Sequence, residues 1–305
     1  MGDAAQGEPR KHEVFSTPFE VKPKLTFWKT PKNYRRFPGG DELMDEVRVW
    51  RVQNTGKSIG GVVSRSYGFE DSPDAEVLTA GYNVGKESGA VGVGRHGNFL
   101  QWGFSAPPSK MTEAGRKFFL NCIYYIHRFD GKRPLVYRQS SHRMDAVRLA
   151  ALLNRIKDPK WHARIFPSEL LKKYKGNPDG LVKYYKDNFE LIYRDKHFLV
   201  DAELKALGIE SNRKVSSLKR LIELLENPEQ AKLARQLLRR YTEKSYAKQA
   251  QWRKWLKENR DRIYFSDIGG YKFRVIPEDY LKLPPPREKA TGSAHTPGAA
   301  TDTQR

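Results

Sequence analysis

The 305-residue sequence has a single cysteine, Cys122, which excludes an internal disulfide and any metal site made of cysteines alone. We expect this cysteine to be an apolar position of a helix. No apolar run approaches the roughly eighteen residues that a membrane-spanning helix needs. The seven histidines show neither H-x-x-x-H nor H-E-x-x-H spacing, so the sequence predicts no metal site.

The amino-terminal segment also lacks an apolar stretch, so Met1–Pro9 is not an intact signal peptide. Asp3-Ala-Ala-Gln-Gly has the small residues of the flank of a cleavage site. The expected location is extracytoplasmic (periplasmic) if a leader has been removed, and cytoplasmic otherwise. We expect residues 1–11 to be disordered.

Acidic residues are scarce relative to basic ones, and the imbalance lies in the second half of the chain. Residues 1–130 contain 18 Lys and Arg against 15 Asp and Glu, a net charge of +3. Residues 131–305 contain 38 against 21, a net charge of +17. Such an excess attracts polyanions, whether nucleic acid, acidic glycan or a membrane surface, without selecting among them.

The hydrophobic pattern divides the chain into two domains and predicts an α+β fold. Residues 12–135 read as a β-rich domain in which Thr112 caps a helix that runs to about Arg128. Its expected strands are rich in Val, Tyr, Phe and Trp and cover 47–52, 61–69, 76–82, 90–94 and 98–104. On the last of these, Trp102 is expected to point into the core, toward Phe118 and Cys122.

Residues 136–283 change to helical spacing and predict a basic helical domain, best described as a small bundle. Two aromatic and β-branched runs flank Gly269-Gly270 and predict a closing β-hairpin over 262–276. The tail, 284–305, lacks aromatic residues, and we expect it to be disordered.

Two glycine motifs imitate catalytic or cofactor loops. Gly92-Val-Gly94-Arg-His-Gly97 matches G-x-G-x-x-G, but strand-like residues follow where a phosphate-binding loop requires a helix. We therefore expect a hairpin turn at Arg95–Asn98 and no nucleotide cofactor. Gly56-Lys-Ser58-Ile-Gly60 matches the hydrolase elbow, and it too is followed by a strand-like run, so no catalytic serine is predicted.

Polar residues of the first domain form one candidate ligand-binding site. Within the acidic segment 67–76, Glu70, Asp71 and Asp74 offer oxygen ligands for a cation or for the guanidinium of Arg95. A solvated turn is the competing interpretation. The candidate residues are Glu70, Asp71, Asp74, Arg95 and His96.

Basic residues interleave with the apolar stripes over 232–260 and form a candidate anion-binding face. The alternative is a face that is merely solvated. The candidates are Lys232, Arg235, Arg239, Lys248, Arg253, Lys254, Lys257 and Arg260.

Three stretches carry a family resemblance: HEVFSTPFEV (12–21), EDSPDAEVLTAGYN (70–83) and the run from Ala90 to Ile126. They resemble the closing half of the glutamine amidotransferase-like fold in its trehalose-utilisation (ThuA-type) branch, as found in uncharacterised planctomycete-type bacterial proteins. The resemblance covers about residues 12–135 and implies part of an α/β domain. The matching framework positions are Gly92, Gly94, Gly97, Asn98, Trp102, Gly103 and Asn121.

The active relatives carry a cysteine on a G-x-C-x-G elbow, which this chain lacks, so the resemblance transfers no catalytic residue. The sequence thus favours a non-catalytic binding or scaffold protein whose basic helical domain meets an anionic partner, with a protein partner as a further option. The alternative is a degenerate or unrecognised hydrolase of carbohydrates or esters that uses Glu70, Asp71, Arg95 and His96. A third hypothesis, nucleic-acid binding, rests on the charge alone.

Overall fold

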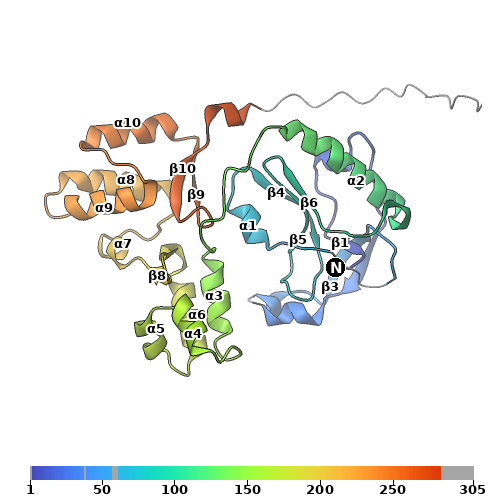
Figure 1. The fold of residues 1–305 in the computed structure, drawn as a ribbon, viewed down its shortest axis with the longest axis horizontal. Coiled ribbons are helices and arrows are strands. Elements are labelled where there is room, and N and C mark those ends of the chain that lie inside the picture. Colours follow the sequence, from blue (N-terminus) through green and yellow to red (C-terminus); the bar gives the residue numbers. More distant parts are fainter. Residues whose placement is uncertain (1, 38, 57–60, 283–305) are drawn as a thin grey trace, which may run out of the picture.

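The computed structural model describes residues 2–37, 39–56 and 61–282. It is an α+β protein, as the sequence predicts: a β-rich unit is followed by helices and a closing hairpin (Figure 1). Ser58 and the tail over 284–305 lie outside the described residues. Within the described part of the chain, none of the helices has the length and apolar character needed to cross a membrane.

The first unit is built on a six-stranded sheet in which every neighbouring pair is antiparallel. The strand order is β2-β3-β1-β4-β5-β6. Its strands are β1 (Ala4–Gln6), β2 (Leu25–Lys29), β3 (Glu46–Arg51), β4 (Ala75–Gly81), β5 (Val91–His96) and β6 (Phe99–Trp102).

Helix α2 (Glu113–Ile126) packs on this sheet and closes the core. Thr112 is its N-cap, as predicted, and accepts a hydrogen bond from the Gly115 backbone N–H at 2.9 Å. A Cβ on Gly115 would lie only 2.0 Å from the Val52 carbonyl oxygen, so glycine permits the helix to approach β3.

The predicted orientation of Trp102 is confirmed, because its ring packs against Phe118 at 5.5 Å between centroids. Cys122 is buried at 1% exposure in the same core, as expected for an apolar helix position.

Two predictions for the first unit are wrong. Ala4–Gln6, expected in a disordered leader, forms β1 and pairs with both β3 and β4. Its small residues carry little strand propensity, and only the two neighbouring strands make this segment extended. The expected strand 61–69 makes isolated bridges at Gly61 and Ser64 and then forms helix α1 (Ser66–Glu70). The bridges join Gly61 to Phe104 and Ser64 to Val91, and two separate bridges do not make a continuous strand.

The Gly92–Gly97 segment is strand β5 and the start of a turn, and no helix begins after it, as predicted. Gly97 has a φ of 57°, in the left-handed region. A Cβ there would also lie 2.6 Å from the Lys132 carbonyl oxygen. Position 97 therefore requires glycine for two reasons: the turn needs a positive φ, and the backbone around Lys132 packs directly against it.

The helical unit has two cores rather than the single bundle that the sequence favours. One core gathers α3 and α6 with β7 and β8, and the other gathers α8–α10 with the closing hairpin; Val200 contacts both. The elements are α3 (Met144–Ala151), α4 (Pro159–Ile165), α5 (Ser168–Lys173), α6 (Pro178–Asp187), β7 (Ile192–Arg194), β8 (Phe198–Val200), α7 (Ala202–Ala206), α8 (Val215–Glu223), α9 (Ala231–Thr242) and α10 (Gln249–Asn259).

The closing hairpin is present as predicted, with β9 (Ile263–Ser266) paired to β10 (Lys272–Val275). Gly270 and Tyr271 take positive φ values of 94° and 59° in its turn. The hairpin lies between the helices and the β-rich unit (Figure 1), and the turn residue Ile268 accepts backbone hydrogen bonds from Gln139 and Ser140 of the connecting segment. It is therefore the part of the helical unit from which contacts to the first unit can be made.

Candidate functional site

The five candidate residues of the first unit do not converge on one site. Glu70 is exposed at the end of α1. Arg95 pairs with Glu76, its cross-strand neighbour, at 2.5 Å between Nε and Oε1, and not with the predicted carboxylates. Its guanidinium lies 3.7 Å above the centroid of the Phe129 ring. The prediction that Glu70, Asp71 or Asp74 holds Arg95 is wrong, because the strand register places Glu76, the last residue of the acidic segment, opposite it.

Glu76 is the centre of a half-buried polar cluster that sequence reasoning missed. His12 lies 3.2 Å from its Oε2, and the Tyr125 hydroxyl donates to its Oε1. Although burial opposes it, hydrogen bonds from His12 and Tyr125 lower the pKa of Glu76 to about 2. No local signal marked this pair, because the turn at Arg95–Asn98 sets the register of β5 with β6, whereas Glu76 lies on β4.

Asp74 and His96 do come together, and Ser72 joins them. The Ser72 hydroxyl donates to Asp74 Oδ1 at 2.5 Å, and His96 Nε2 lies 3.1 Å from Ser72 Oγ and 3.4 Å from Asp74 Oδ1. Burial works against ionisation, yet hydrogen bonds from His96 and Ser72 hold the pKa of Asp74 well below its usual range. These are the residue types of a hydrolytic triad.

Their geometry is not that of a triad. A triad histidine meets the serine with one ring nitrogen and the carboxylate with the other, so that it can move a proton between them. Here Nε2 of His96 faces both partners, and Ser72 is 4% exposed with its hydroxyl directed at Asp74. The other oxygen of Asp74 accepts hydrogen bonds from Leu135 N and the Tyr280 hydroxyl, at 2.9 and 2.7 Å. The arrangement fixes the carboxylate and exposes no nucleophile.

Asp71 reaches across to the second unit. Its Oδ2 accepts hydrogen bonds from Ser266 Oγ at 2.5 Å and from the Ile268 backbone N–H at 2.8 Å, and its Oδ1 accepts one from the Asp267 N–H at 2.7 Å. Burial raises the pKa of Asp71 to about 6. The solvated turn expected as the alternative is therefore also wrong for Asp71, because its carboxylate caps the closing hairpin.

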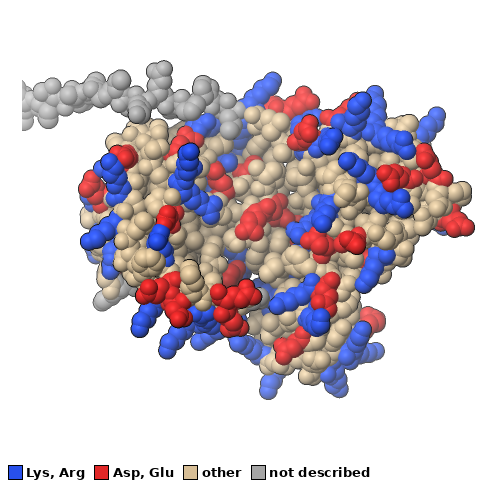
Figure 2. All heavy atoms as spheres, turned by 180° about the vertical axis from the view of Figure 1, so that it is seen from behind, with Lys and Arg blue, Asp and Glu red and all other residues tan. Residues whose placement is uncertain are grey.

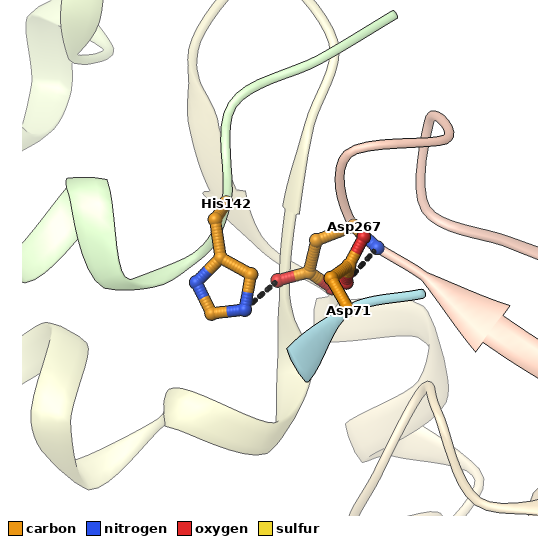
Figure 3. A group of neighbouring side chains, drawn as sticks. All are labelled: Asp71, His142 and Asp267. Carbon is orange, nitrogen blue, oxygen red and sulfur yellow. Dashed lines mark hydrogen bonds and ion pairs between the residues drawn. The ribbon is translucent and has the colours of Figure 1, made fainter. Parts of the chain in front are cut away.

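Asp71, His142 and Asp267 form a group of possible metal ligands in the described part of the chain (Figure 3). One ligand atom from each lies within 4.8 Å of the others, and His142 Nε2 points at Asp267 Oδ2 across 3.5 Å. Burial lowers the pKa of His142 to about 4, which leaves the ring neutral near pH 7. A neutral imidazole and two carboxylates are suitable ligands for a divalent cation.

The positive charge of Arg143 already compensates the carboxylate of Asp267 in this group. Its side chain is fully buried and makes a two-pronged pair with Asp267, through Nε at 2.8 Å and Nη2 at 2.6 Å. Both oxygens of Asp71 are likewise engaged by the hairpin. A cation would have to displace Arg143, so we interpret the cluster as the connection between the two units. No local sequence pattern marks His142, Arg143 or Asp267, because their partners are distant in the chain.

The eight basic candidates have different environments. Arg235 is not a free cation, since its guanidinium donates to the carbonyl oxygens of Tyr246 and Ala247, at 3.4 and 2.7 Å, and holds the loop before α10. Lys254 pairs with Glu258 at 3.8 Å along α10. Lys232, Arg239 and Lys248 are exposed.

The remaining three candidates line one groove between α8 and α10. Arg253, Lys257 and Arg260 stand on α10 and at its end, and Lys219 of α8, missed by sequence reasoning, faces the same groove. Its volume is about 410 Å³, and Ile222, Glu223 and Leu256 complete the lining. All four cations are exposed, and Arg253 also pairs with Glu226 at 3.4 Å between Nη2 and Oε1. The sequence signal for Lys219 was available, since it lies on the polar side of the apolar stripe of α8.

The groove is more informative than the total charge. On the face of the molecule shown in Figure 2, Lys and Arg side chains are interspersed with Asp and Glu. A high net charge distributed in this way attracts anions weakly and without a preferred place. Four cations around one depression define such a place.

Comparisons with protein-family models, with curated proteins and with solved structures find no match for this chain.

Proposed function

We propose that this chain is a non-catalytic binding protein whose helical unit holds an anionic partner in the groove between α8 and α10. The observation that carries the proposal is the set of four exposed cations, Lys219, Arg253, Lys257 and Arg260, around that groove. One acidic side chain, Glu223, lines it with them. Like charges gathered in this way repel one another and gain from an anion placed between them.

The arrangement of the other candidates supports a binding role over hydrolysis. Glu70, Asp71, Arg95 and His96 each have different surroundings, and a hydrolytic site requires its acid, base and nucleophile at one substrate. The proposed kinship with the ThuA-type amidotransferase-like fold agrees with this role, since it would supply a framework without its nucleophile. The first unit would then serve as the scaffold that carries the helical unit.

The proposal is tested by measuring the binding of a heparin-like polymer, a DNA duplex and anionic vesicles at two salt concentrations. The groove variant combines Arg253→Gln, Lys257→Gln and Arg260→Gln in the full chain. A matched control combines Lys232→Gln, Arg239→Gln and Lys254→Gln, which removes the same charge from exposed positions outside the groove.

We expect at least one polyanion to bind at low salt, the groove variant to bind it roughly tenfold more weakly and the control to change it less than about threefold. Equal losses in both variants would mean that binding follows net charge alone. If none of the three probes binds at low salt, the proposal is refuted.

A further inference from the structure

We propose that the partner is duplex nucleic acid, held by its phosphodiester backbone. This inference rests on the proposed function and names its ligand. It follows from three features of the groove and its surroundings: the spacing of its cations, a second basic depression on the same helix, and the absence of exposed apolar anchors around it.

The cations of α10 form a row. Arg253, Lys257 and Arg260 are separated by four and three residues, which places them on one face of the helix over about 10 Å of its axis. Lys219 approaches the groove from α8. A duplex presents a phosphate charge about every 1.7 Å of its axis, so a rigid row of this length meets several of them. The planar guanidinium groups also match the oxygens of a phosphate in pairs.

A second basic depression adjoins α8. It has a volume of about 270 Å³, and its lining includes Lys214 and Arg220 together with Ser216 and Glu210. Lys219 and Arg220 are consecutive on α8, so the two depressions receive cations from the same turn of one helix, although Arg220 also pairs with Glu223 at 3.3 Å. A small anion would occupy one depression, whereas a polymer with repeated charges can contact both.

The surface around the groove excludes several other partners. No large hydrophobic side chain is exposed between residues 138 and 280, all of which the structure describes. Membrane-surface helices insert exposed apolar side chains into the bilayer. Grooves that bind amphipathic peptides present an accessible apolar surface to the anchoring side chains of the peptide. Apolar floor residues of the groove, Ile222 and Leu256, are only 2% and 8% exposed.

The same surface argues against single strands. Binding to single-stranded nucleic acid depends on bases stacked on aromatic side chains, and the linings of both depressions contain none. Contacts from exposed cations alone suit the phosphates of a duplex, which such contacts position without reading its sequence, and the heparin-like probe distinguishes a duplex from an acidic glycan.

The experiment measures binding of the full chain to four probes at matched charge concentration: a 20-base-pair duplex, one of its strands alone, a heparin-like polymer and anionic vesicles. The groove variant and the control variant are the same as above. Each affinity is measured over a series of salt concentrations, and the duplex is used in two unrelated sequences.

We expect the duplex to bind at least about fivefold more tightly than the other probes, with equal affinity for both sequences. The groove variant should lower the slope of log affinity against log salt by about 2 to 3, because roughly 0.9 of a counterion is released for each phosphate contact. The control variant should leave that slope within about 0.5 of the parent value.

Two outcomes separate this inference from the proposed function. If heparin or vesicles bind more tightly than the duplex and still depend on the groove cations, the ligand assignment is wrong and the anion-binding function stands. If no probe distinguishes the groove variant from the control, both proposals fail.

Discussion

Asp71 accepts a hydrogen bond from the Ser266 hydroxyl, 195 residues further along the chain, at 2.5 Å. The same carboxylate accepts the backbone N–H groups of Asp267 and Ile268, so one side chain of the first unit caps the hairpin turn of the second. A second contact of this kind joins Asp74 to Tyr280 at 2.7 Å. The acidic segment that the sequence marks as a candidate ligand site is therefore a connection within the protein.

We predict that Asp71→Ala lowers the free energy of unfolding by about 2–4 kcal/mol, because it leaves two backbone N–H groups of the hairpin without their acceptor. The control is Glu70→Ala, next to it and exposed, which should change stability by less than about 0.5 kcal/mol. Urea unfolding of both variants checks this. Equal effects would show that Asp71 contributes little to joining the units.

We predict that Arg143→Ala lowers the free energy of unfolding by about 3–5 kcal/mol, because it leaves the carboxylate of Asp267 buried without its cation. The comparison is Arg220→Ala, which removes an exposed pair with Glu223 at 3.3 Å and should cost no more than about 1 kcal/mol. Urea unfolding measures both. A small loss in Arg143→Ala that zinc or magnesium restores would indicate instead that the cluster accepts a metal.

We predict that the contribution of Glu76 to stability disappears in acid. The pKa of Glu76 is lowered to about 2, so its ionised form stabilises the folded state above the ordinary pKa of 4.5, and this stabilisation is lost as the pH falls through 2. Glu76→Gln should therefore be less stable than the parent at pH 7, with the difference narrowing from about pH 4.5 downward. Unfolding free energies measured at pH 7, 4 and 3 test the trend. A constant difference would show that the charge of Glu76 has no role.

We predict that Phe118→Ala lowers the free energy of unfolding by about 3–5 kcal/mol. Its ring is fully buried and contacts Phe15 and Trp50, at 4.8 and 5.6 Å between centroids. Leu120→Ala removes a side chain that is 41% exposed on the same helix and should cost less than about 1 kcal/mol. Thermal unfolding of the two variants compares them, and similar midpoints would mean that α2 does not close the core.

The sequence by itself determined the elements whose signals are local. Thr112 begins α2 because a capping threonine and an apolar helical stripe lie within a few residues of each other. Gly269-Gly270 marks the closing hairpin for the same reason, since turn and strand residues are adjacent. The rejection of the nucleotide loop at Gly97 also needed only the residues that follow it. The concentration of positive charge in the second half of the chain is likewise a property of composition.

Only the tertiary structure decided which distant groups meet. Ala4–Gln6 becomes a strand because β3 and β4 lie on either side of it, and its own residues give no such signal. The packing of separate segments brings Asp71 into hydrogen-bonding distance of Ser266. It also places Lys219 of α8 beside the cations of α10. Periodicity and turn chemistry describe a segment and its immediate neighbours, whereas these contacts depend on how whole elements bury their apolar faces against one another.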